Sequence, residues 1–475
     1  MAVGTELRAA ATWREAAARP VNGASAAFFR IAFGIAMLVN VLLYLPTLVH
    51  EYYVDTSFHF SYAWFDFIKP LPGFGIHAVY VVQGLLAILI ALGLWYRRAV
   101  AGFFVLHTYV VLIDSTYFQN HEYLISLVSF LMIFMPLERR WSLDAWRRPD
   151  LASSTIPAWV VWLIRFQFGI VYFYGGVAKL NSDWLQGEPL RMWLHARTDI
   201  PIIGPLFEHE PIVLFMTYGS LIFDLAITFL LLHRRTQVPA FLVACCFHLL
   251  NVRLFGLFVF PWLMIAASTI YFRPDWPERV WAWVVALRAA APVARARARV
   301  QRVAAGRGRV GDGDSTSTLR AEGGPQPRIS STLATFLAVW AAVQILVPLR
   351  HVLIPGSPNW TEEGHRFSWH MKLRDKQGTG VFYVTENGAT WRVEASEHLN
   401  ALQEFRLYGH PERLVRFAHY LSDQHDGAEV RAVTSVSLNG RAPAPIVDPK
   451  IDLASAQLVW WGHADWIRPL DTPLP

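Results

Sequence analysis

The sequence predicts a polytopic α-helical membrane protein of eight or nine spans that carries a β-rich (α+β) domain at its C-terminus. Only 16% of its 475 residues are charged and 54% are hydrophobic, whereas soluble domains carry about 25% charge. The apolar residues cluster repeatedly through the first 275 residues, in runs close to the ~20 residues that a membrane helix needs. After residue 354 the runs give way to short β-branched stretches, which are typical of strands.

Nine apolar runs are candidate membrane spans. They lie near residues 26–48, 73–95, 99–117, 122–137, 156–178, 211–232, 238–254, 255–272 and 331–353. Several are short, and the runs on either side of Asn251–Arg253 are also consistent with one broken helix. The expected count is therefore eight or nine.

The distribution of arginine predicts the orientation, because basic loops stay on the cytoplasmic side of a membrane. Arg97–Arg98, the loop 138–148 and Arg234–Arg235 fall on the same side as residue 1. Segment 288–328 adds nine arginines against three acids, and its Gly, Ser and Pro content is typical of a disordered linker. The N-terminus is thus expected in the cytoplasm. The loops 49–72, 118–121 and 179–210, and all residues after 354, are expected outside it.

This orientation divides the chain into five parts. They are a cytoplasmic N-terminal segment (1–25), a transmembrane domain (26–275), an Arg-rich cytoplasmic linker (276–330), a last transmembrane helix (331–353) and an extracytoplasmic β-rich domain (354–475). No basic-then-apolar cleavable signal precedes the first apolar run, which is expected to act as an uncleaved insertion signal.

The outer domain is expected to contain strands and one helix. Strands are predicted at Gly380–Thr385, Ala389–Val393 and Val430–Leu438, where β-branched residues alternate with others. Turns are predicted at Glu386–Gly388 and Asn439–Gly440, and a helical run is predicted at 398–422.

Several classes of function are not expected. The net charge of +6 is explained by the cytoplasmic loops, so no nucleic-acid partner is predicted. The two cysteines, Cys245 and Cys246, are adjacent in an apolar run, where neighbours point in different directions and do not pair. No metal-ligand spacing such as HExxH or CxxC occurs, so no metal is predicted.

Lysine is rare in this chain, and one lysine lies at the end of an apolar span. Only five of the 42 basic residues are lysines, and Lys179 lies in Tyr172–Trp184 (YFYGGVAKLNSDW). A desolvated lysine can lose its proton and act as a base, whereas arginine cannot. The alternative is a structural lysine that extends its charge to the membrane interface.

Other polar residues are expected near the same depth of the membrane. Glycines 175 and 176 permit close approach of another helix or a ligand. Asp224 lies mid-span, where an unpaired carboxylate is costly. The remaining candidates are Asn120 and His121 at an outer turn, and His248 and Asn251 on one helix face by i, i+3 spacing. Each alone is also consistent with a satisfied polar residue of the core.

At these residues the chain resembles a known family. Tyr172–Trp184 closely resembles the segment of vitamin K-dependent gamma-carboxylases that holds their catalytic lysine, and Lys179 falls on that lysine. Asn120–His121 resembles the site of the histidine that assists this base. Ser368 and Trp369 fall in the region that the family uses around its glutamate substrate. The likeness also includes Phe247–Phe255, Trp276–Pro277, Asn359–Met371, Ser435–Asp452 and Trp466–Leu470.

The resemblance covers roughly residues 25–275 and 331–470 and implies a quinol-driven carboxylation at a bacterial inner or plasma membrane. A lysine amine deprotonates vitamin K hydroquinone, or the host's menaquinol, which reacts with O2 to give a strongly basic alkoxide. The alkoxide removes a γ-proton from a glutamate of a peptide or protein, CO2 adds to the carbanion, and the quinone leaves as its epoxide. The implied partners are membrane lipid, the quinone and a Glu-containing peptide, and no metal is needed.

Two residues depart from the animal members, since His365 and Arg374 stand where a tyrosine and a histidine are expected. Two alternatives therefore stay open. One is a quinol epoxidase or oxygenase that does not carboxylate peptides, and the other is a non-enzymatic membrane binding or transport protein on the same fold.

Overall fold

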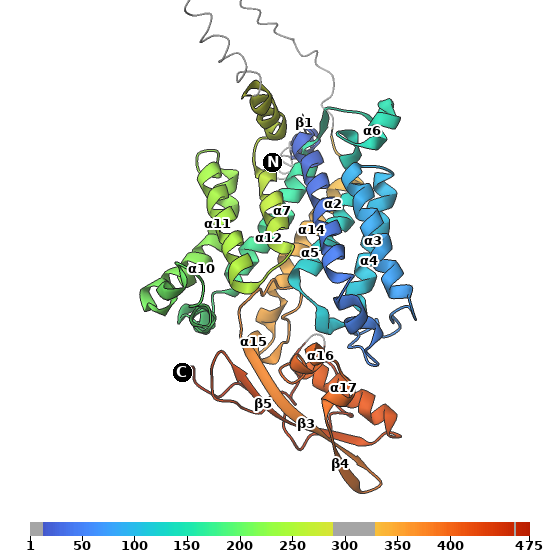
Figure 1. The fold of residues 1–475 in the computed structure, drawn as a ribbon, viewed down its shortest axis with the longest axis vertical. Coiled ribbons are helices and arrows are strands. Elements are labelled where there is room, and N and C mark those ends of the chain that lie inside the picture. Colours follow the sequence, from blue (N-terminus) through green and yellow to red (C-terminus); the bar gives the residue numbers. More distant parts are fainter. Residues whose placement is uncertain (1–12, 288–327, 460–461) are drawn as a thin grey trace, which may run out of the picture.

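The computed structural model describes residues 13–287, 328–459 and 462–475. Within them, a bundle of helices stands above a smaller domain built around a sheet (Figure 1). Among the residues that the structure describes, seven helices are long and apolar enough to cross a membrane, and two shorter apolar helices accompany them. Each of the nine predicted spans thus contains an apolar helix, and the predicted fold class is confirmed. The predicted linker falls largely on residues 288–327, which lie outside the described residues.

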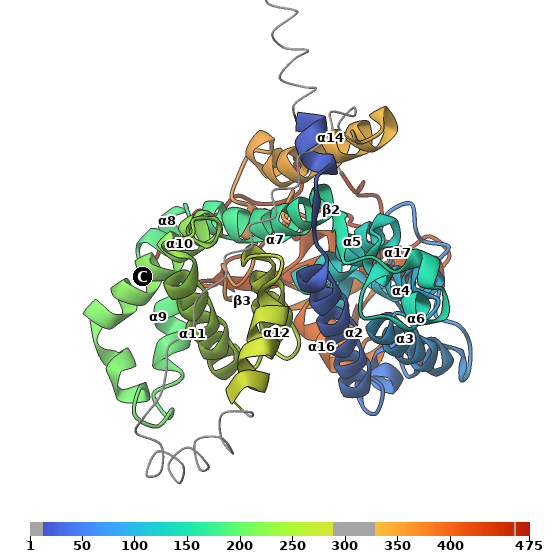
Figure 2. The same ribbon diagram turned by 90° about the horizontal axis from the view of Figure 1, so that it is seen from above.

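The helices of the bundle follow the predicted runs. They are α2 (Ala24–Tyr44), α3 (Gly75–Leu92), α4 (Tyr96–Ile113), α5 (Asn120–Phe134), α7 (Ala158–Ala178), α10 (Glu210–Leu232), α11 (Gln237–Phe255), α12 (Phe260–Ser268) and α14 (Ser331–Leu346). Helix α14 lies at the periphery of the bundle, where 11% of its apolar window is buried (Figure 2). It is held there by Trp340, whose ring stacks on Phe130 and whose Nε1 donates to Gln167.

Short elements join these helices. They are β1 (Pro20–Asn22), β2 (Thr155–Pro157), α6 (Leu143–Arg147), α8 (Ser182–Leu185), α9 (Leu190–His195) and several 3-10 turns. Strands β1 and β2 pair antiparallel. Helix α6, which carries part of the predicted cytoplasmic charge, lies at the end of the bundle opposite the sheet domain (Figure 1).

Two arginines close helix ends inside the bundle. Arg30 is fully buried and donates to the carbonyls of Ile90 and Ala91, both at 2.7 Å. Arg165 donates to the carbonyls of three successive residues, Ile270 to Phe272. The last carbonyls of a helix have no partner within it, so each guanidinium satisfies acceptors that burial would otherwise leave unpaired.

The break between α11 and α12 differs from the sequence-based expectation. Helix α11 continues through Asn251–Arg253 to Phe255 and ends at Gly256, which has φ +61°. A glycine takes this left-handed conformation at low cost and is a common helix terminator. The turn therefore lies one helical turn later than predicted, and His248 and Asn251 are both inside the helix.

The outer domain is an α+β unit with a three-stranded antiparallel sheet in the order β4-β3-β5. Its elements are α15 (Pro358–Thr361), β3 (Lys376–Glu386), β4 (Ala389–Val393), α16 (Ala401–Phe405), α17 (Pro411–Gln424) and β5 (Glu429–Leu438). Alternate residues of β5 are buried, and the buried ones pack on the apolar face of α17, including Leu414 and Phe417. All three predicted strands are confirmed.

The single helix predicted at 398–422 is wrong, because the segment forms α16 and α17 with a turn between them. Asn400 caps α16 through a capping box with Gln403. Pro411 occupies the first turn of α17, a position that needs no N–H donor, whereas proline inside a helix would remove a hydrogen bond. The turn directs residues 406–410 toward the membrane domain, where Arg406 donates to the carbonyl of Thr116.

Candidate functional site

Lys179 and Asp224 form a buried ion pair at the outer end of the bundle. Lys179 caps α7, and its Nζ lies 2.6 Å from Oδ2 of Asp224 on α10. The two residues are 5% and 7% exposed. The rings of Trp184 and Phe247 lie 5.0 and 5.9 Å from Nζ. The amine is therefore enclosed by aromatic faces and held by one carboxylate.

Glycine permits this pair to form. A Cβ on Gly176 would lie 2.7 Å from Cγ of Leu225 and 2.9 Å from its backbone nitrogen, which real Cβ atoms do not tolerate. A Cβ on Gly175 would lie 3.4 Å from Oδ2 of Asp224. Helices α7 and α10 thus approach each other closely, as small residues allow in membrane helix pairs.

The outer segment 359–371 reaches the same place. The Cε atom of Met371 lies 3.3 Å from the Cβ position of Gly175, beside the ion pair. Asn120 at the start of α5 donates its side-chain N–H to the carbonyl of His370 at 3.0 Å. These contacts join the predicted base, the outer turn of α5 and the outer segment.

The rings of two further candidates flank one phenylalanine. His121 and His248 lie 5.9 and 6.2 Å from the ring of Phe260. His121 is 3.3 Å from the carboxylate of Glu122. Among the described residues, no hydrogen bond or ion pair joins His121 to Lys179, so their connection in the structure is indirect.

Sequence reasoning missed Tyr172. Its hydroxyl is 2.6 Å from Nε2 of His248, which is itself buried. The signal was present, since Tyr172 precedes Lys179 by two helical turns and so shares its face of α7. Asn251, one turn after His248, is half-buried and makes no hydrogen bond to these residues within the described part of the chain.

Ser368 and Trp369 are buried structural neighbours of the site. The Ser368 hydroxyl donates to the carbonyl of Gly364 at 2.6 Å. The Trp369 ring lies 5.1 Å from that of Tyr123 on α5. Neither residue lines the large cavity beside them.

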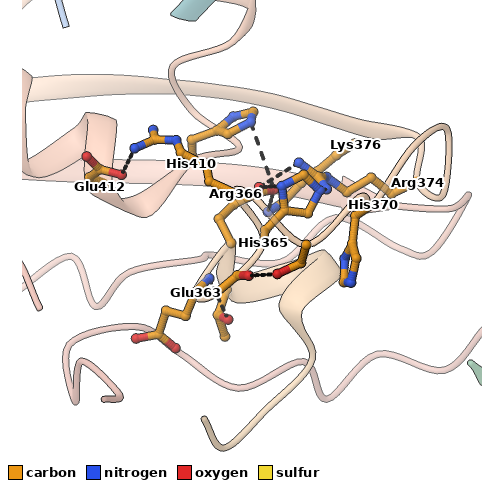
Figure 3. A network of polar contacts seen from close by, with 12 residues as sticks. Glu363, His365, Arg366, His370, Arg374, Lys376, His410 and Glu412 are labelled. Carbon is orange, nitrogen blue, oxygen red and sulfur yellow. Dashed lines mark hydrogen bonds and ion pairs between the residues drawn. The ribbon is translucent and has the colours of Figure 1, made fainter. Parts of the chain in front are cut away.

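That cavity, of about 460 Å³, lies between the outer domain and the membrane domain. Its walls hold seven Lys or Arg residues and four Asp or Glu residues, namely Arg350, Arg366, Lys372, Arg374, Lys376, Arg406, Arg413, Glu362, Glu363, Asp375 and Glu412. Glu362 is central, because its two oxygens accept from Arg374 at 2.6 Å and from Lys376 at 3.1 Å. Figure 3 shows the labelled part of this network, with His365 and His410 beside the two cations.

Burial changes the acid–base properties of this network. It lowers the pKa of Lys376 to about 8, although Glu362 acts in the opposite direction. It also lowers the pKa of His370 to about 3 and holds the pKa values of His365 and His410 well below their usual range, with the nearby cations adding to the effect. The three histidines are therefore neutral at pH 7 and leave the cavity cationic through Lys and Arg.

A second cavity, of about 260 Å³, lies between α4, α5 and α14 and is lined by apolar surface. Phe118 contributes to the walls of both cavities. No group of three or more His, Cys, Asp or Glu residues suited to a metal ion occurs in the described ranges.

Two family models match the chain. The model of the HTTM domain matches residues 18–276, and that of the vitamin K-dependent gamma-carboxylase lumenal domain matches residues 329–473. The first match alone covers more than half of the chain. No solved structure matches it. The resemblance found in the sequence is confirmed.

Proposed function

Since the chain belongs to the HTTM-domain family and joins this domain to the lumenal domain of vitamin K-dependent gamma-carboxylases, we propose that it is a hydroquinone-driven glutamyl carboxylase. In this proposal Lys179 is the base that takes a proton from the hydroquinone. Oxygenation of the quinol by O2 supplies the stronger base that removes the glutamate γ-proton. CO2 then adds to the glutamate, and the quinone leaves as its epoxide.

The observation that carries the proposal is the buried Lys179–Asp224 pair. A base at Nζ becomes an ammonium when it takes a proton, and an ammonium out of water is costly unless it is paired. The Asp224 carboxylate, 2.6 Å away, supplies that pairing. The step therefore begins with a neutral Lys179 amine beside the Asp224 carboxylate, and the proton taken from the hydroquinone completes the ion pair.

The surroundings of Nζ favour chemistry that water would quench. The flanking rings of Trp184 and Phe247 and the low exposure of the pair keep solvent away. A strongly basic intermediate needs such exclusion, because water would protonate it first. The Met371 contact brings the outer segment next to the site, so a substrate held by that domain lies near the base.

The other predicted residues have assisting roles in this proposal. His121, with Glu122 beside it, assists the base, and Asn120 ties the outer segment to α5.

His248 has a buried Nδ1 with no hydrogen-bond partner among the described residues, so it can bind a hydroxyl of the quinol. Asn251 lies one turn further on, and Ser368 and Trp369 hold the shape of the outer segment. Chemistry at these residues needs no metal.

The quinol and the peptide are proposed to approach from different sides. Membrane lipid supplies the apolar tail of vitamin K hydroquinone or menaquinol, and the apolar cavity at α14 has walls suited to such a chain. The Glu-containing peptide arrives on the extracytoplasmic side, where the outer domain is placed. The N-terminus is cytoplasmic, in a bacterial inner or plasma membrane.

One observation favours a second candidate, a quinol epoxidase that does not carboxylate peptides. Arg374 and Lys376, two of the cations that a glutamate carboxylate would use, already hold Glu362. In that case the Lys179 chemistry would run without a bound peptide.

An assay of the purified protein separates the candidates. The protein is given vitamin K hydroquinone, O2, labelled bicarbonate and a Glu-containing peptide, beside the variants Lys179→Ala and Lys179→Arg. We expect epoxide and fixed label from wild type, and the loss of both in the two variants, because arginine keeps the charge but cannot act as a base. Epoxide without label would support the epoxidase. Full activity of Lys179→Arg would refute Lys179 as the base.

A further inference from the structure

The large cavity already contains a carboxylate of the chain itself. Glu362 reaches Arg374 and Lys376 with one oxygen each, and the rings of His365 and His410 lie within 3.9 Å of it. We propose that Glu362 occupies a carboxylate-binding position in the ligand-free protein and that the carboxylate of an incoming glutamate displaces it. This inference rests on the proposed function only in naming glutamate as the ligand.

The other acids of the cavity wall are engaged elsewhere. Glu412 pairs with Arg366 and Arg416, Glu363 pairs with His463 at the rim, and Asp375 accepts from Trp193. Figure 3 shows Glu363 pointing away from the cationic cluster. Among the described residues, Glu362 is thus the carboxylate paired with Arg374 and Lys376, and its position is the one that an external carboxylate would take.

The cavity also has capacity for more negative charge than it holds. Arg413 is buried and donates to two backbone carbonyls, while its Nε has no hydrogen-bond partner among the described residues. Its pKa is lowered to about 9 by burial and by Arg366 and Arg406. Buried cations that repel one another are stabilised by an added anion. When the incoming carboxylate takes its position, the displaced Glu362 carboxylate can therefore stay in the cavity, beside Arg413.

A histidine in the same wall lacks partners. His370 is 6% exposed, and neither ring nitrogen has a hydrogen bond in the described part of the chain. Buried polar groups are nearly always paired, so this ring indicates a ligand position. The rings of His351 and His365 flank it at 4.7 and 5.1 Å. His370 precedes Met371, whose Cε atom lies against Gly175 beside the Lys179–Asp224 pair, so the ligand position lies near the proposed base.

The backbone at Glu362 favours rearrangement. Four non-glycine residues of segment 362–372 have left-handed φ angles, namely Glu362, Phe367, Trp369 and Lys372. This conformation is unfavourable for residues with a Cβ and clusters at functional sites. Glu362 follows directly after α15, so its side chain can swing away without unfolding that helix.

Ligand binding without turnover tests the inference. The probe is N-acetyl-glutamyl amide, whose only charge is its γ-carboxylate, and N-acetyl-glutaminyl amide is the uncharged control. Binding to the purified full chain is measured by calorimetry in the absence of quinol. We expect Glu362→Gln to bind the charged probe roughly tenfold more tightly than wild type, since a tenfold change corresponds to one modest ionic contact. The uncharged probe should show no such gain.

Glu363→Gln is the matched control, because it removes the neighbouring carboxylate and leaves Arg374 and Lys376 paired. Its affinity for the charged probe should equal that of wild type. Equal or weaker binding by Glu362→Gln would overturn the inference and make Glu362 a structural member of the network. If Glu362→Gln does not fold, Glu362→Asp takes its place, because its shorter side chain withdraws the charge from Arg374 and Lys376. This variant should also bind the charged probe more tightly than wild type. Binding no tighter than that of wild type would overturn the inference.

The outcome is separable from that of the proposed function. Tighter binding by Glu362→Gln together with no epoxide or fixed label from wild type would sustain the displacement and refute the carboxylase. Normal turnover by wild type, together with an unchanged affinity of Glu362→Gln for the charged probe, would support the carboxylase and refute the displacement. Lys179→Ala should retain the probe affinity of wild type, because Lys179 does not line the cavity.

Discussion

At the scale of single residues, the proposed chemistry of Lys179 depends on Asp224. It lies on a different helix from Lys179 and 45 positions further along the chain, yet it is the carboxylate that the buried amine meets. A buried ion pair contributes little net stability, but removal of one partner is costly because the other charge stays buried. The small net stability that such a pair contributes is consistent with the proposed role in proton transfer.

We predict that Asp224→Asn lowers epoxide formation by roughly 10²-fold or more, the scale of a lost acid–base contribution. The amide cannot stabilise the Lys179 ammonium that proton transfer creates. Rates of epoxide formation at saturating quinol, and the Michaelis constant, are the measurements. Asp55→Asn, at an exposed carboxylate paired with His50, is the control and should retain the wild-type rate. An unchanged rate in Asp224→Asn would refute the pairing role.

His370 provides a second prediction at this scale. Its pKa of about 3 lies below the value of about 6.5 that it has in the unfolded chain. The unfolded state therefore binds more protons between these values, and the stability of the folded state falls as the pH is lowered below about 6.5. His365 and His410 act in the same direction.

We expect the melting temperature to be lower at pH 5.5 than at pH 7.5, and this difference to be smaller in His370→Gln. The measurement is thermal unfolding of the purified protein at the two pH values. His50→Gln, at an exposed histidine, is the control and should keep the wild-type difference. A wild-type protein equally stable at both pH values would contradict the prediction.

At the scale of elements, the contact of α7 with α10 sets the geometry of the Lys179–Asp224 pair. Gly176 lies against the backbone of Leu225, the residue after Asp224. Any side chain at position 176 therefore moves Asp224 relative to Lys179. The glycine pair in the sequence thus has a packing role that the Lys179–Asp224 geometry depends on.

We predict that Gly176→Ala destabilises the protein by about 1–3 kcal/mol, the usual cost of overpacking, and also lowers epoxide formation. Gly219→Ala is the matched control on α10, since nothing lies within 4 Å of its Cβ position. That variant should be neutral or slightly more stable, because alanine is the better helix former. Thermal unfolding and epoxide assays of both variants are the measurements. Equal stability of the two would contradict the close packing.

The sequence predicted helices and strands correctly where a single pattern of neighbouring residues was strong. The three strands alternate with period two, and the apolar runs are long, so both appeared in the pattern. The segment 398–422 was less informative, because two short helices and one long helix share the same composition. Pro411 was the available signal for the division, since proline is favoured at the start of a helix and not in its interior.

At the scale of the whole molecule, a buried ion pair between Arg441 and Asp183 joins the outer domain to the membrane domain, and a more exposed pair between Arg416 and Asp66 also connects them. Arg441, just after β5, donates to both oxygens of Asp183 at 2.6 and 2.7 Å, and Asn439 adds a third bond at 2.7 Å. Burial would raise the pKa of Asp183, but these hydrogen bonds outweigh it and lower the pKa. Asp183 lies in α8, four residues after Lys179, so this contact positions the outer domain over the proposed base.

We predict that Arg441→Met destabilises the docked outer domain by about 3–5 kcal/mol, because it leaves Asp183 buried without its cation. Carboxylation should fall more than epoxide formation, since in the proposed function the outer domain presents the glutamate. Arg431→Met is the matched control on β5, where the exposed arginine pairs with Glu429. Unfolding measurements and the ratio of fixed label to epoxide test this. A ratio equal to that of wild type would contradict the docking role.

The sequence by itself determined the membrane class, the apolar spans, the outer strands and the family, because each depends on composition, on short-range periodicity or on motifs that are continuous in the chain. It also singled out Lys179, because the motif around this residue is continuous in the chain. The tertiary structure decided which groups meet: Asp224 with Lys179, Tyr172 with His248, Glu362 with Arg374 and Lys376, and Arg441 with Asp183. Helix packing and domain docking set these contacts, and the energy of each contact depends on burial that only the folded chain creates.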